Sequence, residues 1–287
     1  MTQLDPVRPL ALNMSVFDGA SLFDSLPRAA ELGLEAVELT ADVPQLFPAL
    51  TSMGQVARLS ALLADLGLRV VNLSGETGRG FFSPIPAGPV YEPSLIAPQG
   101  PARRLRLQHL LRCLDFAFAL GAPCISVASG VCLPGMRPHQ AWEQFQEGLA
   151  ALLGHAEELG VLVAVAPRPH HLVARTEDLL ALLEALPHPL LGASLDLAQM
   201  AREGEDVAAA ALALSGRIWT VQATDARLPS PYRLAPGSGS VDLRRMLDAL
   251  DFARYGGPLT LHLENECDRP EAAIQQALEA LAPRVLA

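Results

Sequence analysis

The chain has 287 residues, of which 50% are hydrophobic and 18% charged, so it carries enough apolar material for a full core and is not a disordered chain. Its 21 basic and 31 acidic residues give a formal net charge of −10, which argues against nucleic acid and anionic membrane surfaces as partners. All 21 basic residues are arginine, which excludes Schiff-base lysine chemistry and a P-loop lysine. Acid–base chemistry must come from His, Asp, Glu, Tyr or Cys, because arginine does not exchange its proton near neutral pH.

A recurring module organises the chain: an amphipathic helical stretch ends in Leu-Gly and a short β-rich run follows. The glycines stand where the residue after a helix adopts a left-handed backbone; they are Gly33, Gly67, Gly121 and Gly160. The runs are rich in Val, Leu and Ile, as buried parallel strands are. The pattern predicts strands over 10–16, 36–39, 69–73, 124–128, 162–166, 191–195, 218–222 and 259–263. It predicts helices over 22–32, 55–66, 102–120, 139–159, 177–186, 207–214, 241–250 and 271–286.

Eight strands alternating with eight helices, with no linker, predict a single (β/α)8 TIM-barrel domain over residues 1–287. A doubly wound open sheet is the alternative, but residues 13–20 lack the Gly-x-Gly-x-x-Gly turn expected of it. In a TIM barrel the functional residues lie in the loops after the strands. Two such loops, 75–100 and 224–240, are long and rich in Pro and Gly. They are either ordered lids or ordinary surface loops.

The cysteines and the N-terminal stretch bear on location. Cys113, Cys124, Cys132 and Cys267 show no Cys-x-x-Cys spacing, which is typical of reduced thiols in a cytoplasmic protein. Residues 1–9 lack a basic region followed by a long apolar run, and no apolar stretch reaches transmembrane length without a charge or a proline. We therefore expect a cytoplasmic protein without a membrane segment.

Polar residues at the predicted strand ends are the candidates for catalysis. Asp196 follows a buried run, where an unpaired carboxylate is costly. Alternation along the last strand places Thr260, His262 and Glu264 on one face, and a histidine with a carboxylate can carry protons or bind a metal ion. We predict His262, Glu264 and Asp196 as catalytic residues. Asp196 and His262 are also the candidates for metal ligands. The site holds either a weakly bound divalent ion or no ion.

Other strand-end residues are candidates for substrate binding. The segment 232–239 is similar to an anion clamp, with the Arg233 guanidinium beside a glycine-flanked turn that offers free N–H groups. Adjacent His170 and His171 cannot both aim at one point, so one of them serves the site or both are loop histidines. Glu38 is either a site residue or a structural partner of an arginine. The predicted substrate-binding residues are Arg233, Gln222, Asp225, Glu38, Asn72, His170 and Gly237.

Five segments occur in a characteristic order: RTEDLLALLEAL (175–186), GASLD (192–196), IWTVQATD (218–225), RLAPGSGSVD (233–242) and GGPLTLHLENE (256–266). Together they resemble the sugar phosphate isomerase/epimerase superfamily, the xylose isomerase-like TIM barrels, over about Leu10 to Leu286. The superfamily includes isomerases, epimerases, dehydratases and a DNA-repair endonuclease branch, so the resemblance names no substrate.

The resemblance implies one divalent metal ion, held by Glu after strand five, Asp after strand six, His after strand seven and Glu on strand eight. These positions fall on Ala166, Asp196, Gln222 and His262, so only Asp196 matches. Glu264 lies two residues beyond His262 on the same face. This residue set does not favour the usual metal-assisted proton transfer, in which the ion polarises the substrate while a carboxylate takes the proton.

Three functions follow as hypotheses. The first is an isomerase- or epimerase-like enzyme that moves a proton on a small sugar, polyol or sugar acid, with an altered or absent metal site. The second is a non-catalytic barrel that binds a sugar-like metabolite or a protein partner. The endonuclease branch is disfavoured, because it needs many metal ligands and a basic face, whereas the chain has seven histidines and a net charge of −10. We expect a small-molecule partner, no nucleic acid and no membrane, and the sequence leaves a homo-oligomer open.

Overall fold

A computed structural model describes residues 8–17, 19–230, 232–282 and 285–286. The strands are β1 (Arg8–Asn13), β2 (Ala36–Thr40), β3 (Arg69–Ser74), β4 (Cys124–Val127), β5 (Leu162–Val165), β6 (Leu191–Asp196), β7 (Ile218–Gln222), β8 (Leu259–Leu261) and β9 (Val285–Leu286). The helices are α1 (Leu22–Glu31), α2 (Met53–Asp65), α3 (Gly100–Leu120), α4 (Pro138–Leu159), α5 (Thr176–Ala185), α6 (Leu197–Arg202), α7 (Val207–Ala213), α8 (Leu243–Phe252) and α9 (Pro270–Leu281). Two short 3-10 helices are η1 (Met14–Val16) and η2 (Arg79–Phe81).

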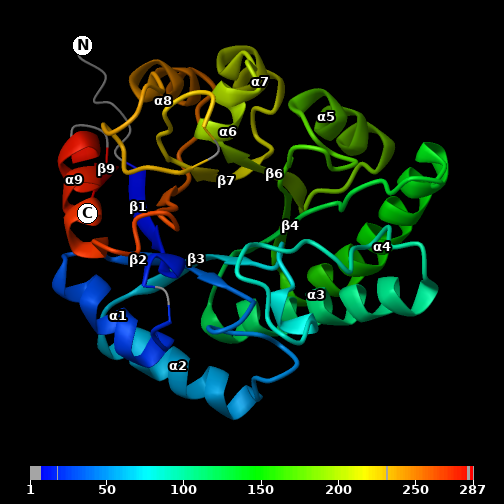
Figure 1. Ribbon diagram of the computed structural model, residues 1–287, viewed down its shortest axis with the longest axis horizontal. Helices are drawn as coiled ribbons and strands as arrows, with labels where there is room; N and C mark the ends of the chain where they lie inside the picture. The colour runs from blue at the N-terminus through cyan, green and yellow to red at the C-terminus, as the bar shows by residue number, and fades with distance from the viewer. Residues whose placement is uncertain (1–7, 18, 231, 283–284, 287) are drawn as a thin grey trace. The chain divides into compact units, whose positions relative to one another are not determined.

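The strand order confirms the predicted fold class. Neighbouring strands are hydrogen-bonded in the order β2-β3-β4-β5-β6-β7-β8-β1-β9, and β2 also pairs with β1. The pairing of β1 with both β2 and β8 is parallel, with Ala11 opposite Ala36 on one side and Thr260 on the other. Strands β1 to β8 therefore close on themselves, with helices between successive strands along the chain (Figure 1). This is a (β/α)8 TIM barrel.

The chain divides into two compact units, each described here by itself. Unit 1 consists of Met1–Glu38, Leu62–Val71 and Ser194–Ala287, and unit 2 of Leu39–Ala61 and Asn72–Ala193. The boundaries fall inside β2, α2, β3 and β6, so each of these elements contributes residues to both units. The single domain over 1–287 stays a prediction.

Unit 1 carries β1, β7 and β8 together with the helices near the C-terminus. Ala11, Ala36 and Val71 form a small buried apolar cluster on its strands. Helices α7 and α8 pack against each other (Figure 1). Strand β6 ends at Asp196, and α6 begins at the next residue with Asp196 as its N-cap. The strand-to-helix turn therefore fixes the Asp196 side chain at the carboxyl end of the strand.

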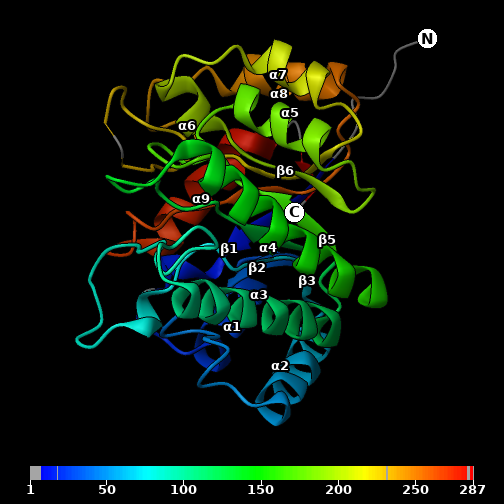
Figure 2. The same ribbon diagram turned by 90° about the vertical axis from the view of Figure 1, so that its right-hand side faces the viewer.

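Unit 2 carries β4 and β5 with the two longest helices of the described chain. Helices α3 and α4 lie side by side (Figure 2). Strands β4 and β5 pair in parallel from Cys124 opposite Leu162 to Val127 opposite Val165, and all of these residues except Leu162 are buried. These short apolar runs form strands because both of their faces are covered, as in other parallel sheets.

The Leu-Gly modules end as predicted. Gly33, Gly67, Gly121 and Gly160 all have a left-handed backbone, with φ values of 82°, 69°, 69° and 67°. After Gly121 and Gly160, each of which caps its helix, the chain turns directly into β4 and β5. A residue with a Cβ atom is strained in this conformation, which explains the recurrence of glycine.

Several boundaries differ from prediction. The predicted first strand over 10–16 ends at Asn13 and continues as η1, and the predicted last strand over 259–263 ends at Leu261. The short helix α6 was not predicted. The predicted C-terminal helix over 271–286 ends at Leu281, before β9. Among the described helices, none combines the length and the apolar character needed to cross a membrane.

Candidate functional site

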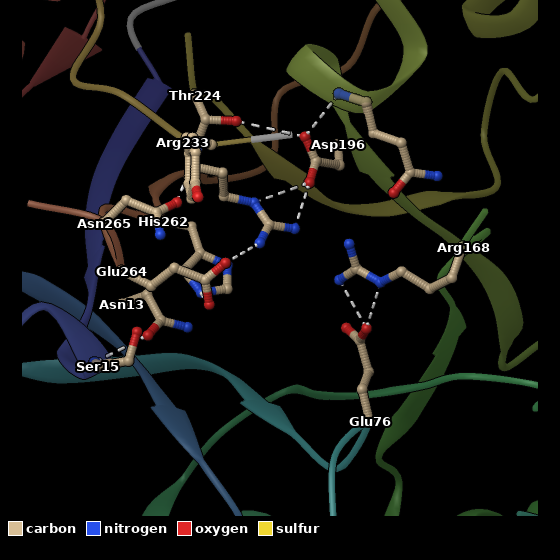
Figure 3. Close-up of polar contacts among 12 residues, drawn as sticks. Asn13, Ser15, Glu76, Arg168, Asp196, Thr224, Arg233, His262, Glu264 and Asn265 are labelled. Carbon is tan, nitrogen blue, oxygen red and sulfur yellow. Dashed lines mark hydrogen bonds and ion pairs between the residues drawn. The ribbon is translucent and has the colours of Figure 1, made fainter. Parts of the chain in front are cut away.

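An arginine links two carboxylates at the carboxyl ends of strands in unit 1 (Figure 3). Arg233, in the loop between β7 and α8, donates from Nε and Nη2 to Oδ2 of Asp196, at 3.2 and 2.7 Å. Its Nη1 donates to Oε1 of Glu264, three residues after β8. The Asp196 side chain is 7% exposed, that of Arg233 16% and that of Glu264 32%. The three predicted site residues therefore meet in one ion-pair network.

Two further groups fix the Asp196 carboxylate. Its Oδ1 accepts hydrogen bonds from the backbone N of Gln199 at 3.1 Å and from Oγ1 of Thr224 at 3.3 Å. With the two bonds from Arg233, both carboxylate oxygens have defined partners. Thr224 was not a sequence candidate. The sequence did contain a signal for it. Thr224 lies two residues after Gln222 and so continues the alternation of β7 beyond the end of the strand.

His262 and Glu264 form the second contact of this network. Nε2 of His262 lies 3.4 Å from Oε2 of Glu264. Burial alone would raise the pKa of the Glu264 carboxyl, but the charges and hydrogen bonds of His262 and Arg233 outweigh it and hold the pKa below its usual range. Glu264 is therefore ionised at neutral pH. The predicted placement of His262 and Glu264 on one side of the chain is confirmed.

Buried polar atoms without partners lie on the neighbouring strand positions. Gln222 on β7 is the register partner of Thr260 on β8. Within the described residues, Oε1 of Gln222, Oγ1 of Thr260 and Nδ1 of His262 are buried and have no hydrogen-bond partner. Such atoms are costly unless a ligand or water satisfies them. They can accept from or donate to hydroxyl groups, as a polyol would require.

Glu38 is fully buried in the middle of β2, as the last residue of that strand that belongs to unit 1. Its Oε1 accepts a hydrogen bond from Nδ2 of Asn13 at 2.6 Å, and the two residues are register partners on β2 and β1. Oδ1 of Asn13 in turn accepts from the backbone N of Ser15 at 2.9 Å, which starts η1. The expectation that Glu38 ends its strand is wrong, because β2 continues to Thr40. The role of Glu38 in substrate binding stays a prediction.

Unit 2 holds a separate polar chain on its own strands and just after them, and Figure 3 shows the contact of Arg168 with Glu76. Nδ2 of Asn72 donates to Oγ of Ser126 at 3.1 Å, and that hydroxyl donates to Oε1 of Glu76 at 3.1 Å. Nε and Nη2 of Arg168 contact Oε2 of Glu76 at 2.7 and 2.6 Å. All four side chains are buried. The proposed substrate role of Asn72 stays a prediction, because its contact here is with Ser126.

Of the two adjacent histidines, the predicted binding residue is His170, but the one that is buried is His171. His170 is exposed and has a left-handed backbone with φ of 65°, whereas His171 is buried. Nδ1 of His171 accepts a hydrogen bond from the N–H of Gly130 at 3.3 Å, and its ring packs edge-on against Tyr91. Burial, with the charge of Arg168, lowers the pKa of His171 to about 4. His171 is thus a neutral structural residue.

The expectation of free N–H groups in the glycine-flanked turn is wrong. The backbone N–H groups of Gly237, Gly239 and Val241 all donate to the carboxylate of Asp225, at 2.8–3.1 Å. A Cβ atom on Gly239 would come within 2.2 Å of the Asp225 carboxylate, so glycine is required there by close approach. The turn does hold an anion, but the anion belongs to the chain itself. Asp225 and Gly237 therefore organise the loop that carries Arg233.

The residues present do not fit the divalent metal ion that the resemblance implies. Among the described residues, no group of three His, Cys, Asp or Glu side chains could hold a metal ion. The Ala166 side chain offers no ligand atom, and the Arg233 guanidinium lies against Asp196, the one matching ligand. At an effective dielectric constant of about 20, a divalent ion about 4 Å from that guanidinium would be repelled by about 8 kcal/mol.

Comparisons with known proteins agree with this fold. A protein of Streptomyces coelicolor named "Putative hydroxypyruvate isomerase" is 25% identical over 256 residues, which are 86% of this chain and 87% of that protein. The crystal structure of a xylose isomerase domain protein from Planctomyces limnophilus superposes with a TM-score of 0.73 at 22% identity, covering 96% of each chain. That of a D-allulose 3-epimerase from Methylomonas sp., solved with D-allulose, gives 0.74 at 20% identity and covers 99% of this chain and 100% of the epimerase.

The family assignment rests on nearly the whole chain. The model of the family described as "Xylose isomerase-like TIM barrel" matches residues 26–284. The match begins in α1 and ends after α9, so it includes the strand ends that carry Asp196, Arg233 and Glu264. This chain belongs to the xylose isomerase-like TIM barrel family.

Proposed function

We propose that this protein is an isomerase- or epimerase-type enzyme that moves a proton on a small sugar, polyol or sugar acid, and that it does so with an altered, metal-free site. The observation that carries the proposal is the contact of His262 with Glu264 inside the Arg233 network. The family assignment and the relatives named as isomerase and epimerase support the reaction class.

His262 is the proposed base. A carboxylate only accepts hydrogen bonds, so Nε2 of His262 carries the hydrogen in the contact with Glu264. The proposed step starts from the neutral tautomer, in which Nδ1 bears the lone pair. In the proposed step Nδ1 takes the proton from the carbon next to a carbonyl group, and the C–H electron pair forms the enediolate. Delivery of the proton to the former carbonyl carbon, together with transfer of the hydroxyl proton from one enediolate oxygen to the other, completes an isomerisation. Glu264 orients the imidazole and stabilises its protonated form.

Arg233 and Asp196 supply the electrostatics of the step. The guanidinium, which Asp196 and Glu264 hold in place, puts a fixed positive charge beside the histidine. Such a charge stabilises the negative oxygen that develops on the substrate. Gln222 and Thr260, with their buried unsatisfied oxygens in the described chain, are the proposed contacts for substrate hydroxyls. Asp196 acts as a positioning residue in this scheme.

The test is exchange of substrate hydrogen with solvent deuterium, followed by proton NMR. The substrates are hydroxypyruvate and a panel of ketoses and aldoses, because exchange reports proton abstraction even where net conversion is small. We expect exchange with the wild-type protein and a loss of at least about 100-fold in the His262→Gln variant, the usual range for a general base. His139→Gln is the matched control, since His139 is exposed on α4. Equal exchange rates in His262→Gln and the wild type would contradict the proposal.

A second candidate is a non-catalytic barrel that binds a sugar-like metabolite. The ion pairs of Arg233 favour it, because they already engage both carboxylates of the network. Calorimetric binding of a panel sugar without any deuterium exchange would establish this candidate and exclude the first. A loss of that binding in Gln222→Ala would place the ligand at the same strand ends.

A further inference from the structure

Asp196 and Glu264 hold one cation between the ends of two strands, and that cation is a side chain. Asp196 stands at the end of β6 and Glu264 just after β8, and both bind the guanidinium of Arg233. Asp196 is also the residue that matches a ligand position of the implied metal ion. The pair of carboxylates therefore has the charge and the placement of a cation site, already filled by the chain.

We propose that Arg233 is a built-in cation that replaces the divalent metal ion, and that its guanidinium is what makes the site selective against metals. Three of its nitrogens bind carboxylate oxygens, with Nε and Nη2 on Asp196 and Nη1 on Glu264. A metal ion that entered would have to displace all three contacts and lie beside a permanently charged group. Guanidinium stays protonated at every physiological pH, so no change of conditions empties the site by deprotonation.

The loop that carries Arg233 is built to keep it there. The N–H of Arg233 donates to Oδ1 of Asn265 at 2.8 Å, which ties the loop to the segment after β8. The Asp225 carboxylate gathers the N–H groups of Gly237, Gly239 and Val241, which closes the loop behind the arginine. Asp225 and Leu234 also form an antiparallel bridge. Arg233 is thus anchored through its backbone as well as through its guanidinium group.

This inference concerns the same site as the proposed function and rests on it for the identity of the site, but its test measures metal binding. Deuterium exchange tests the proposed catalysis, and metal binding tests the exclusion of metal ions. Either statement can therefore fail without the other.

The experiment compares Arg233→Met with the wild-type protein, using Zn²⁺ and Mn²⁺ alone as probes. Met removes the charge and keeps much of the length. Isothermal titration and metal content after desalting are the readouts. We expect one ion per chain in Arg233→Met, bound at least 100-fold more tightly than by the wild type, and a loss of that ion when Asp196→Asn is added. Arg233→Lys, which keeps a cation, and Arg244→Met, at an exposed position on α8, should bind no more Zn²⁺ or Mn²⁺ than the wild type.

Two results would overturn the inference. One is a wild-type protein that takes up one Zn²⁺ or Mn²⁺ per chain in a form that Asp196→Asn abolishes. The other is a folded Arg233→Met, judged by circular dichroism, that binds no ion. If that variant does not fold, the melting temperature of the wild type decides. No change on adding Zn²⁺ after EDTA treatment supports the inference, and a rise that Asp196→Asn abolishes contradicts it.

Discussion

At the scale of single residues, His109 is a buried titratable group that the proposed chemistry does not use. Its ring lies 5.5 Å from the ring of Phe47 and 5.2 Å from that of Phe81, centre to centre, and neither ring nitrogen has a hydrogen-bond partner within the described chain. Burial, with the nearby charge of Arg106, lowers the pKa of His109 to about 3. The histidine is therefore held neutral in the folded protein.

This pKa predicts acid sensitivity. An unfolded histidine has a pKa near 6.5 and binds its proton first, so the contribution of His109 is complete above about pH 6.5 and is lost as the pH falls towards 3. Between pH 7 and pH 4, protonation of this histidine should cost the wild type about 3 kcal/mol of its free energy of unfolding. We expect the His109→Leu variant not to show this loss. Urea unfolding at a series of pH values measures it, with His139→Leu as the exposed control. A parallel decline in His109→Leu and the wild type would exclude this role.

The glycine-flanked turn shows what residue patterns convey and what they omit. The composition of 232–239 predicted a turn with free N–H groups, whereas these groups are engaged by a carboxylate of the chain itself. It could not indicate that the anion is Asp225, because that contact forms only when the loop folds back over 12 to 16 residues. The position of Glu264 was predictable from alternation. Its pairing with Arg233, 31 residues away, depends on the tertiary fold.

At the scale of elements, α3 holds the long loop after β3 in place. Arg106 on α3 is buried, and its five N–H groups donate to five backbone carbonyls of that loop, at 2.7–3.1 Å. Burial lowers the pKa of Arg106 to about 10, which still leaves it charged at neutral pH. The carbonyls belong to Gly75, Glu76, Thr77, Tyr91 and Pro93.

Loss of this side chain should release the loop. We expect Arg106→Met to lower the free energy of unfolding by about 3 kcal/mol, because several buried carbonyls lose their donor. Arg106→Lys should rescue only part of it, since an ammonium group has three donors and guanidinium five. Urea unfolding gives the energy, and limited proteolysis followed by mass spectrometry locates cleavage within 75–99. Arg104→Met, exposed on the same helix, is the control; cleavage of both variants at equal rates would refute the prediction.

The order of strands and helices could be predicted because the signals are local. Each Leu-Gly end and each apolar run lies within about ten residues, and the four left-handed glycines follow the prediction. Helix α6 was missed because its six residues are less than two turns, too short to show a period. The predicted ends of β1 and β8 lie two or three residues too far along the chain, because apolar residues continue after the strand pairing ends.

At the scale of the whole molecule, the net charge bears on the disfavoured endonuclease hypothesis. The net charge is −10, and several arginines, among them Arg106, Arg168 and Arg233, are committed to internal contacts. Fewer cations are thus available to phosphates than the composition suggests. The fold is shared across the family, so the chemistry has to be read from the side chains at the strand ends.

We accordingly expect no binding to duplex DNA, even at low ionic strength, where phosphate contacts are strongest. Fluorescence anisotropy of a labelled duplex, with and without an abasic site, measures this. A basic DNA-binding protein serves as the positive control. Retention that weakens steeply with added salt would revive the endonuclease hypothesis.

The tether of Arg233 has a consequence for how the site comes into being. A metal ion is an exchangeable reactant, whose occupancy depends on supply and on competing ions. A guanidinium on the chain has no dissociation equilibrium of its own, so its partners meet it as soon as the strands assemble. The site then forms when the chain folds. The rate of its formation is first-order in protein and does not depend on the concentration of metal ions. In return, the chain forgoes the open coordination position through which a metal ion activates water.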